Sequence, residues 1–453
     1  TGSRGAAISF AFGLTFIVFT SWRYVEKSSL LKVLIILIVA FLLADIRTDS
    51  MDYNMRDRLV NVQDNQGNFF SSRDALWPSA WQIVKTAPVI GVGIGTYYIV
   101  EPAVRHVNTN SPGFFAHNDY LQFWLETGFI GLSLMLLIMV TISILFVRVF
   151  RQKNLTLHNR LEAIGLVAGL VAIATHSFVD FHFYIVAILM VMGFMCARIQ
   201  EISGHYFPRL MREVIPVRKF SRKMFILVSG ALPLVVLSYS LPVSIADFYM
   251  HKANKQLVGG QVEKAALTLE KAASWNLRSI RIRVQQFSLY RSVLRIIKSD
   301  ALPIERKTYL ARALLALNEI EIINPLAAFV PEGRGYLLIE NSDIVVDDWH
   351  EKAIHEFEKA LQLEPRRYGS RIALARLLVK DDYLNEAVAL MNDGVNYYYE
   401  SNLPSLGKFY HYAVRLNLMS GDTVKAKEIQ VKIDEINSWY SEQNKLSENI
   451  LEN

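Results

Sequence analysis

The chain has 453 residues, a formal net charge of +6 and a sequence pI of about 9.1. Hydrophobic residues make up 52% of it and charged residues 20%, whereas a soluble domain carries about 25% charged residues. With its mean hydropathy of +0.23, this composition excludes intrinsic disorder and argues against a wholly soluble protein. The single cysteine, Cys196, excludes a disulfide framework and a cysteine zinc site.

The first residues, Thr1-Gly2-Ser3-Arg4, lead directly into apolar sequence. They have neither the charged start nor the small-residue cleavage site of a signal peptide. We therefore expect the chain to be the C-terminal part of a longer protein.

About six apolar runs are long enough to cross a bilayer, which takes about 20 mostly apolar residues. The runs cover residues 5–22, 29–46, 128–147, 161–180, 183–199 and 224–246. Because backbone groups in lipid must bond to one another, we expect these runs to be helices. The sequence thus predicts a membrane domain over residues 1–246, a polytopic bundle of about six transmembrane helices.

The connections between these runs differ in charge. Lysine and arginine gather in residues 23–32, 148–160 and 198–223, whereas residues 177–182 contain neither. Basic connections stay in the cytoplasm, so we expect a bacterial inner-membrane protein with loop 47–127 and everything after residue 246 in the periplasm. The basic clusters lie at span ends and lack interleaved aromatic residues, so we expect no nucleic-acid partner.

Residues 247–453 have more charge, and their apolar positions take helical spacing. Two segments resemble each other, Glu263–Ala272 and Glu351–Ala360, each with alanines seven residues, or about two helical turns, apart. This pattern resembles the tetratricopeptide repeat, whose stacked helix pairs build a concave binding surface. We therefore expect an all-α protein in which the membrane bundle is followed by a soluble tetratricopeptide-like domain that can take a protein partner. A generic helical bundle is the alternative.

Four motifs within residues 1–200 stand out in chain order. They are Ser3-Arg4-Gly5, then Arg73 and Trp77 before Pro88–Gly95, then Ala116–Gln122 followed by Glu126-Thr127-Gly128, and finally His176–Phe181. The glycine run has the spacing GxGxG without a strand-helix-strand unit around it, so it is not a dinucleotide fingerprint. Together the four motifs resemble those of the bacterial O-antigen ligase and O-antigen polymerase superfamily.

This resemblance implies a glycosyltransferase. Such enzymes take a glycan from a polyprenyl pyrophosphate carrier and pass it to an acceptor hydroxyl. The resemblance implies that His117 is the base, because imidazole titrates near neutral pH. It implies that Arg4 and Arg73 bind the diphosphate, because guanidinium stays protonated and matches phosphate oxygens. We name as supporting residues Asp119, Glu126, His176 and Asp180. We expect neither a metal nor a cofactor.

Each assignment has a structural alternative. His117 could cap a helix, Arg4 could reach to the membrane interface, and Arg73 could pair with a nearby aspartate. His176 and Asp180, one turn apart, could form a buried structural pair. The acceptor could be a lipid A core sugar, a growing glycan or, in protein O-glycosylation, a serine or threonine. A rival of another class is a non-enzymatic envelope assembly scaffold that recruits proteins through its repeats.

Overall fold

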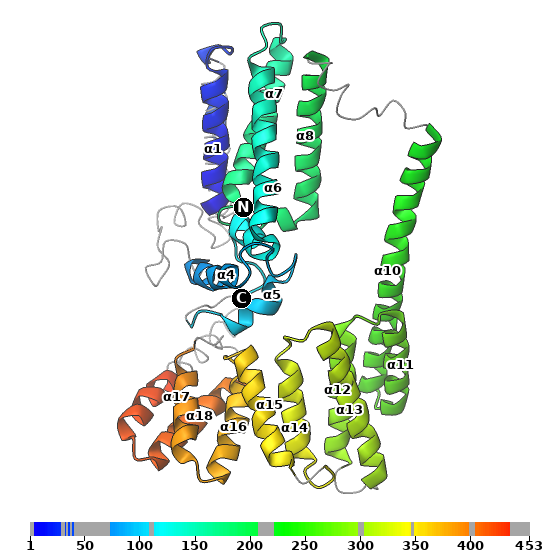
Figure 1. Cartoon of the computed structure of the whole chain (residues 1–453), viewed down its shortest axis with the longest axis vertical. Helices are drawn as coiled ribbons and strands as arrows, with labels where there is room; N and C mark the ends of the chain where they lie inside the picture. The colour runs from blue at the N-terminus through cyan, green and yellow to red at the C-terminus, as the bar shows by residue number, and fades with distance from the viewer. Residues whose placement is uncertain are drawn as a thin grey trace, which may run out of the picture. The chain divides into compact units, whose positions relative to one another are not determined.

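The computed structural model describes residues 4–28, 73–107, 113–206, 222–297, 303–345, 348–397 and 404–434, with a few positions between 32 and 39 (Figure 1). The described residues contain helices and connecting turns and no strand, as the all-α prediction expects. The chain divides into two compact units, Thr1–Lys219 and Phe220–Asn453.

The first unit is a helical bundle built from α1 (Arg4–Ser21), α6 (Asp119–Phe150), α7 (Leu157–His176) and α8 (Val186–Tyr206). Among the described residues, three helices are long and apolar enough to span a membrane, namely α6, α7 and residues 186–204 of α8. The apolar part of α1, residues 5–21, is shorter. Helix α1 packs along α7, and a Cβ atom at Gly13 would lie 3.1 Å from the carbonyl oxygen of Ala168. Small residues therefore let these two helices approach closely.

Two of the predicted spans are not represented among the helices just named. Residues 29–46 lie almost entirely outside the described residues. The last run, 224–246, falls within α10 (Arg222–Val258), a helix of the second unit. The predicted domain boundary at residue 246 thus falls inside one continuous helix.

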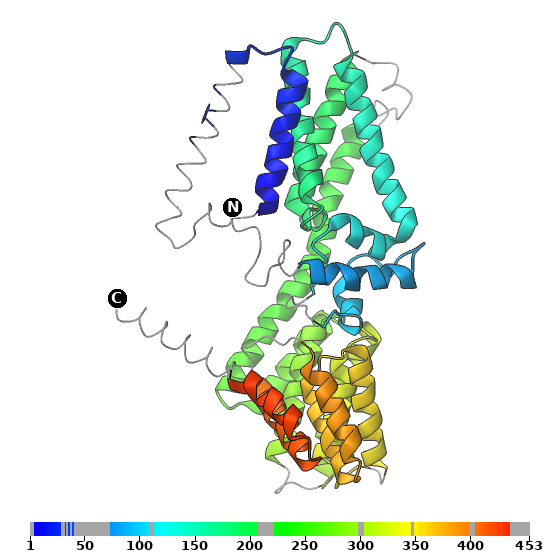
Figure 2. The same ribbon diagram turned by 90° about the vertical axis from the view of Figure 1, so that its left-hand side faces the viewer.

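The predicted loop 47–127 contains helices of its own. These are α4 (Arg73–Thr86), α5 (Tyr97–Val100) and the short 3-10 helix η1 (Glu101–Ala103). Helix α6 starts at Asp119 and bends at Gly128, so its first turns belong to this region too. Helix α4 packs against α6 and lies across the end of the bundle (Figure 2).

The two ends of the bundle differ in chemistry. At one end, Arg160 donates hydrogen bonds to the carbonyl oxygens of Phe150 (2.7 Å) and Gln152 (3.0 Å), which closes the turn between α6 and α7. Arg198 pairs with Glu162 at 2.6 Å near this end. At the other end, the connection from α7 to α8 includes the 3-10 helix η2 (His182–Tyr184). The basic connection 148–160 and the connection 177–185 thus lie at opposite ends.

The second unit is a series of helices in which each packs on the next. After α10 they are α11 (Val262–Trp275), α12 (Ile280–Ile296), α13 (Pro303–Ile323), α14 (Phe329–Glu340), α15 (Trp349–Leu363), α16 (Tyr368–Lys380), α17 (Leu384–Val395) and α18 (Pro404–Met419). Residues 423–434 are also helical. This arrangement is a helical repeat region. The sequence predicts a helical domain in this part of the chain.

The two similar segments of the sequence are α11 and α15. Their small residues are fully buried, for example Ala265 and Ala353. In α15, Phe357 fits against Gly335 of the preceding helix, where a Cβ atom would lie 2.7 Å from the phenyl ring. A small residue on one helix thus makes room for a large side chain from the next.

Candidate active site

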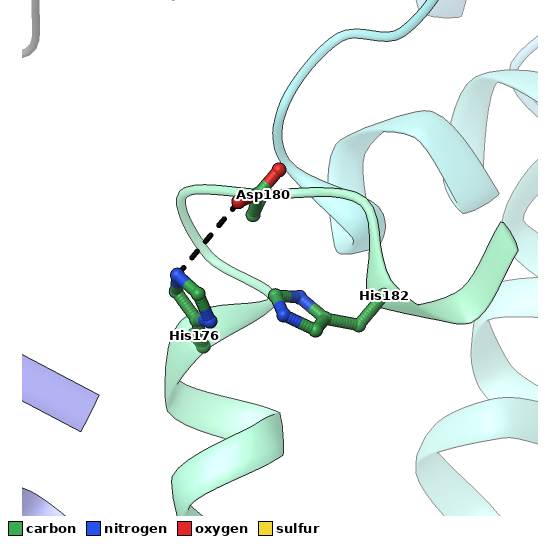
Figure 3. Close-up of side chains that lie close together, drawn as sticks. All are labelled: His176, Asp180 and His182. Carbon is green, nitrogen blue, oxygen red and sulfur yellow. Dashed lines mark ion pairs between the residues drawn. The ribbon is translucent and has the colours of Figure 1, made fainter. Parts of the chain in front are cut away.

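Two segments far apart in the sequence meet at one end of the bundle. His117 lies just before α6, and Asp180 lies in the connection between α7 and α8. The Nδ1 atom of His117 is 3.4 Å from Oδ1 of Asp180, and Nε2 of His176 is 3.8 Å from Oδ2 of the same carboxylate. The side chains of His117 and Asp180 are each 25% exposed, so solvent or a substrate can reach them. Figure 3 shows Asp180 on this connection, between His176 and His182 in the chain, with the ion pair to His176 dashed.

The residues around His117 fix its position. His117 has a φ of 50°, in the left-handed region that few residues other than glycine adopt. Before it, the backbone N–H of Ala116 donates to Oε1 of Gln122 at 2.9 Å. After it, Asn118 caps α6, because its side chain accepts a hydrogen bond from the N–H of Leu121 at 3.0 Å. Asn118, and not His117, is therefore the residue that caps α6. The imidazole of His117 is directed toward Asp180.

Asp119 joins the start of α6 to the connection between α7 and α8. It is fully buried, and its Oδ2 accepts hydrogen bonds from the backbone N–H groups of His182 (2.7 Å) and Phe183 (3.1 Å). Its own N–H donates to the carbonyl oxygen of Ser177 at 2.8 Å. Asp119 thus supports the site through the backbone that carries Asp180.

Glu126 supports the glycine turn. Its buried carboxylate accepts hydrogen bonds from the N–H groups of Gly95 (2.8 Å) and Tyr97 (3.3 Å) and from the hydroxyl of Tyr184 (2.6 Å). Burial and this bond to Glu126 raise the pKa of Tyr184. The N–H of Gly93 donates to the carbonyl oxygen of Glu126 at 2.9 Å. Hydrogen bonds to Glu126 thus hold the glycine turn against the first turns of α6.

The two arginines of the predicted site each begin a helix. Arg4 is the first residue of α1, and Arg73 is the first residue of α4. A Cβ atom on the adjacent Gly5 would lie 3.0 Å from Nε2 of His176. The backbone at the start of α1 therefore lies next to His176. The side chains of Arg4 and Arg73 lie outside the described residues. Their convergence on His117 stays a prediction.

His182 is a neighbour of the site that the sequence analysis did not select. Its ring lies 4.2 Å from that of His176, centroid to centroid. Burial lowers the pKa of His182, although the nearby Asp180 carboxylate acts in the opposite direction, so the neutral imidazole is favoured. The spacing His-x3-Asp-x-His was the signal available in the sequence.

Comparisons with known proteins agree with the motifs. Residues 1–136 match the model of the O-antigen ligase family, Wzy_C. An uncharacterized protein of Haemophilus influenzae is 25% identical over 193 residues, which are 39% of this chain and 46% of that protein. The chain thus spans about half the length of this relative.

Solved structures give weak likenesses. A fragment of MamA from Desulfovibrio magneticus RS-1 is 16% identical with a TM-score of 0.30, covering 43% of this chain and 95% of its own. The type IV pilus biogenesis factor PilW is 14% identical with a TM-score of 0.30, covering 43% and 78%. TM-scores this low do not establish a common fold.

The family match includes α1, α4 and the first turns of α6, and therefore three of the four motifs that carry the resemblance. Only the fourth motif, around His176 and Asp180, lies beyond the matched residues. The region that holds Arg4, Arg73 and His117, residues 1–136, is therefore similar to the O-antigen ligase family.

Proposed function

We propose that this chain belongs to a membrane glycosyltransferase that moves or polymerises glycan from a polyprenyl pyrophosphate carrier onto an acceptor hydroxyl. The observation that carries this proposal is the pair formed by His117 and Asp180, with Nδ1 and Oδ1 3.4 Å apart, next to a region of the O-antigen ligase family. A histidine held by a carboxylate is the arrangement that a general base needs.

His117 is the base in this scheme. Its Nδ1 faces Asp180, so we assign the other ring nitrogen, Nε2, to the acceptor. The acceptor O–H proton passes to Nε2 as the oxygen forms a bond to the anomeric carbon of the donor sugar. Asp180 is a positioning residue, since it orients the ring and stabilises the imidazolium that forms.

The leaving group needs positive charge. As the bond between the anomeric carbon and the diphosphate oxygen breaks, its electron pair goes to the diphosphate. We assign Arg4 and Arg73 to bind this group, since arginine donates two parallel hydrogen bonds to phosphate oxygens. One donor aimed at charge that develops in the transition state contributes about 3–4 kcal/mol. This scheme uses neither a metal nor a cofactor.

A transfer assay with purified full-length protein in lipid nanodiscs tests the role of His117. Polyprenyl pyrophosphate-linked glycan is supplied with acceptor, and consumption of the donor is followed by mass spectrometry. We expect His117→Ala to lower the rate by about 10²–10⁴-fold, which is the usual contribution of a general base. His106→Ala, a histidine of the same loop, is the matched control and should retain the wild-type rate. A folded His117→Ala protein with wild-type transfer would instead favour the assembly scaffold.

Mass analysis of envelope glycoconjugates from cells with and without the gene identifies the acceptor. We propose a sugar hydroxyl, on either the lipid A core or a growing glycan. In that case deletion shortens or removes the polysaccharide and leaves protein glycosylation unchanged. Loss of glycan from serine or threonine of envelope proteins would instead identify a protein O-oligosaccharyltransferase, with the helical repeat region as the place where the polypeptide docks.

A further inference from the structure

Three residues of the connection between α7 and α8 bring metal-ligating atoms together. His176 ends α7, Asp180 follows one turn later, and His182 begins η2. One ligating atom from each lies within 4.8 Å of the other two. Figure 3 shows the three side chains around the bend of this connection. The scheme proposed for glycan transfer gives no role to the side chain of His182.

The spacing of these atoms is close to that of a bound ion. With ligand bonds of about 2.0–2.1 Å, neighbouring ligand atoms around a tetrahedral ion lie about 3.3 Å apart. Nε2 of His176 and Oδ2 of Asp180 are already 3.8 Å apart. Side-chain rotations that close the longer separations, which are up to 4.8 Å, by up to about 1.5 Å would complete the arrangement.

The backbone that carries these ligands is fixed by other contacts. The carboxylate of Asp119 accepts hydrogen bonds from the N–H groups of His182 (2.7 Å) and Phe183 (3.1 Å). The N–H of Val179 donates to the carbonyl oxygen of His176 at 2.9 Å. Nδ1 of His182 is buried and has no hydrogen-bond partner among the described residues. Buried polar atoms normally have a partner, so an unpartnered imidazole nitrogen in this group of three ligand residues fits an ion site.

We propose that His176, Asp180 and His182 bind a divalent transition-metal ion, with Zn²⁺ as the first candidate. Two imidazoles and one carboxylate are a common ligand set for zinc and leave a fourth position open. Oxygen-preferring ions such as Mg²⁺ and Ca²⁺ fit less well, because two of the three ligands are nitrogen.

The same carboxylate serves His117. Its Oδ1 is 3.4 Å from Nδ1 of His117, whereas its Oδ2 faces His176, so an ion bound through Oδ2 competes with His117 for the negative charge of the shared carboxylate. A bound ion therefore slows glycan transfer. This consequence rests on the proposed function, whereas ion binding itself does not.

Titration with Co²⁺ tests the site, because tetrahedrally bound Co²⁺ absorbs visible light and Zn²⁺ displaces it. The protein is the full chain in detergent, compared with His182→Gln and with His158→Gln. His158 is the matched control, since it also lies one turn from a carboxylate, at 3.8 Å from Glu162, and its side chain is 84% exposed. We expect visible bands that Zn²⁺ removes in the wild type and in His158→Gln. We expect affinity at least about 100-fold lower in His182→Gln, since loss of an outer-shell partner alone costs 10–100-fold.

Equal Co²⁺ spectra in the wild type and His182→Gln, or no bands in either, would overturn the site. If His182→Gln fails to elute as a folded protein, Asp180→Asn takes its place in the Co²⁺ titration. In the transfer assay, Zn²⁺ should slow the wild type and His158→Gln but leave His182→Gln unaffected. If Zn²⁺ binds and the transfer rate of the wild type is unchanged, the proposed competition between the ion and His117 for Asp180 is wrong. If the wild-type protein shows no transfer activity, the proposed function is contradicted. The Co²⁺ titration still tests the metal site in that case, because it does not depend on transfer.

Discussion

Gly128 shows how one residue shapes the candidate site. Its φ of 67° and ψ of −173° lie in a region that essentially only glycine adopts. A Cβ atom there would overlap the carbonyl group of Val89. The N–H of Phe129 donates to the carbonyl oxygen of Pro88 at 2.9 Å, which fixes the bend against the glycine turn. The bend separates the site-bearing first turns of α6 from its apolar part.

We expect Gly128→Ala to destabilise the first unit. The backbone strain alone costs about 1–3 kcal/mol, and the overlap with Val89 adds to it. The measurement is the thermal unfolding midpoint of detergent-solubilised protein, followed by tryptophan fluorescence. Gly193→Ala is the control, because a Cβ atom at Gly193 in α8 meets nothing within 4 Å. Equal midpoints for the two variants would contradict the role assigned to the bend.

At the same scale, the sequence selected some residues of the candidate site and not others. It selected His117 and Asp180 through motifs that are local in the chain. It could not predict that the carboxylate of Asp119 binds backbone N–H groups of the connection, because that contact joins residues 63 positions apart in the sequence. His182 was missed for a similar reason, since its position depends on this same contact.

Among the elements, apolar helices were the easiest to predict. Hydropathy alone locates α6, α7 and α8, because lipid allows few structures other than helices. The sequence did not predict helix α4 within the loop 47–127, because the 14 residues of this helix are amphipathic and include Pro78. The sequence also placed the start of the third span at Gly128, where the structure has a bend within a longer helix. Hydropathy reports where lipid begins and does not report where a helix begins.

The packing of α14 on α15 gives a prediction about the helical repeat region. Phe357 is fully buried, and a Cβ atom at Gly335 would lie 2.7 Å from its ring. We expect Gly335→Ala to destabilise the second unit by about 1–3 kcal/mol, the usual cost of overpacking a core. Adding Phe357→Leu should recover part of that loss, since the smaller side chain leaves room for the methyl group. Denaturant unfolding of the full chain, followed by circular dichroism, measures both.

Gly407→Ala is the control for the comparison of Gly335→Ala with the Gly335→Ala, Phe357→Leu double variant. Gly407 lies in α18, and a Cβ atom there meets nothing within 4 Å. Alanine in an open helical position is favoured over glycine by about 0.5–1 kcal/mol, so this variant should be neutral or slightly more stable. Additive effects of Gly335→Ala and Phe357→Leu would show that the two residues do not interact.

At the scale of the whole molecule, the charge pattern predicts which end of the bundle faces the cytoplasm. The basic connection between α6 and α7 and the connection that carries Asp180 lie at opposite ends of the first unit. If basic connections stay inside, His117 and Asp180 face the periplasm, where we propose that glycan transfer takes place. We also propose a periplasmic location for the helical repeat region.

Cysteine labelling in spheroplasts tests this orientation. In a Cys196→Ala background, single cysteines replace three exposed residues, Ala103, Lys153 and Glu358. A membrane-impermeant maleimide should label cysteine at positions 103 and 358 in intact spheroplasts, and at position 153 only after the membrane is opened. The reverse pattern at 103 and 153 would place His117 in the cytoplasm and would contradict transfer outside the membrane. Labelling at 103 without labelling at 358 would leave the site outside and would place the helical repeat region in the cytoplasm, where it could not receive a periplasmic acceptor.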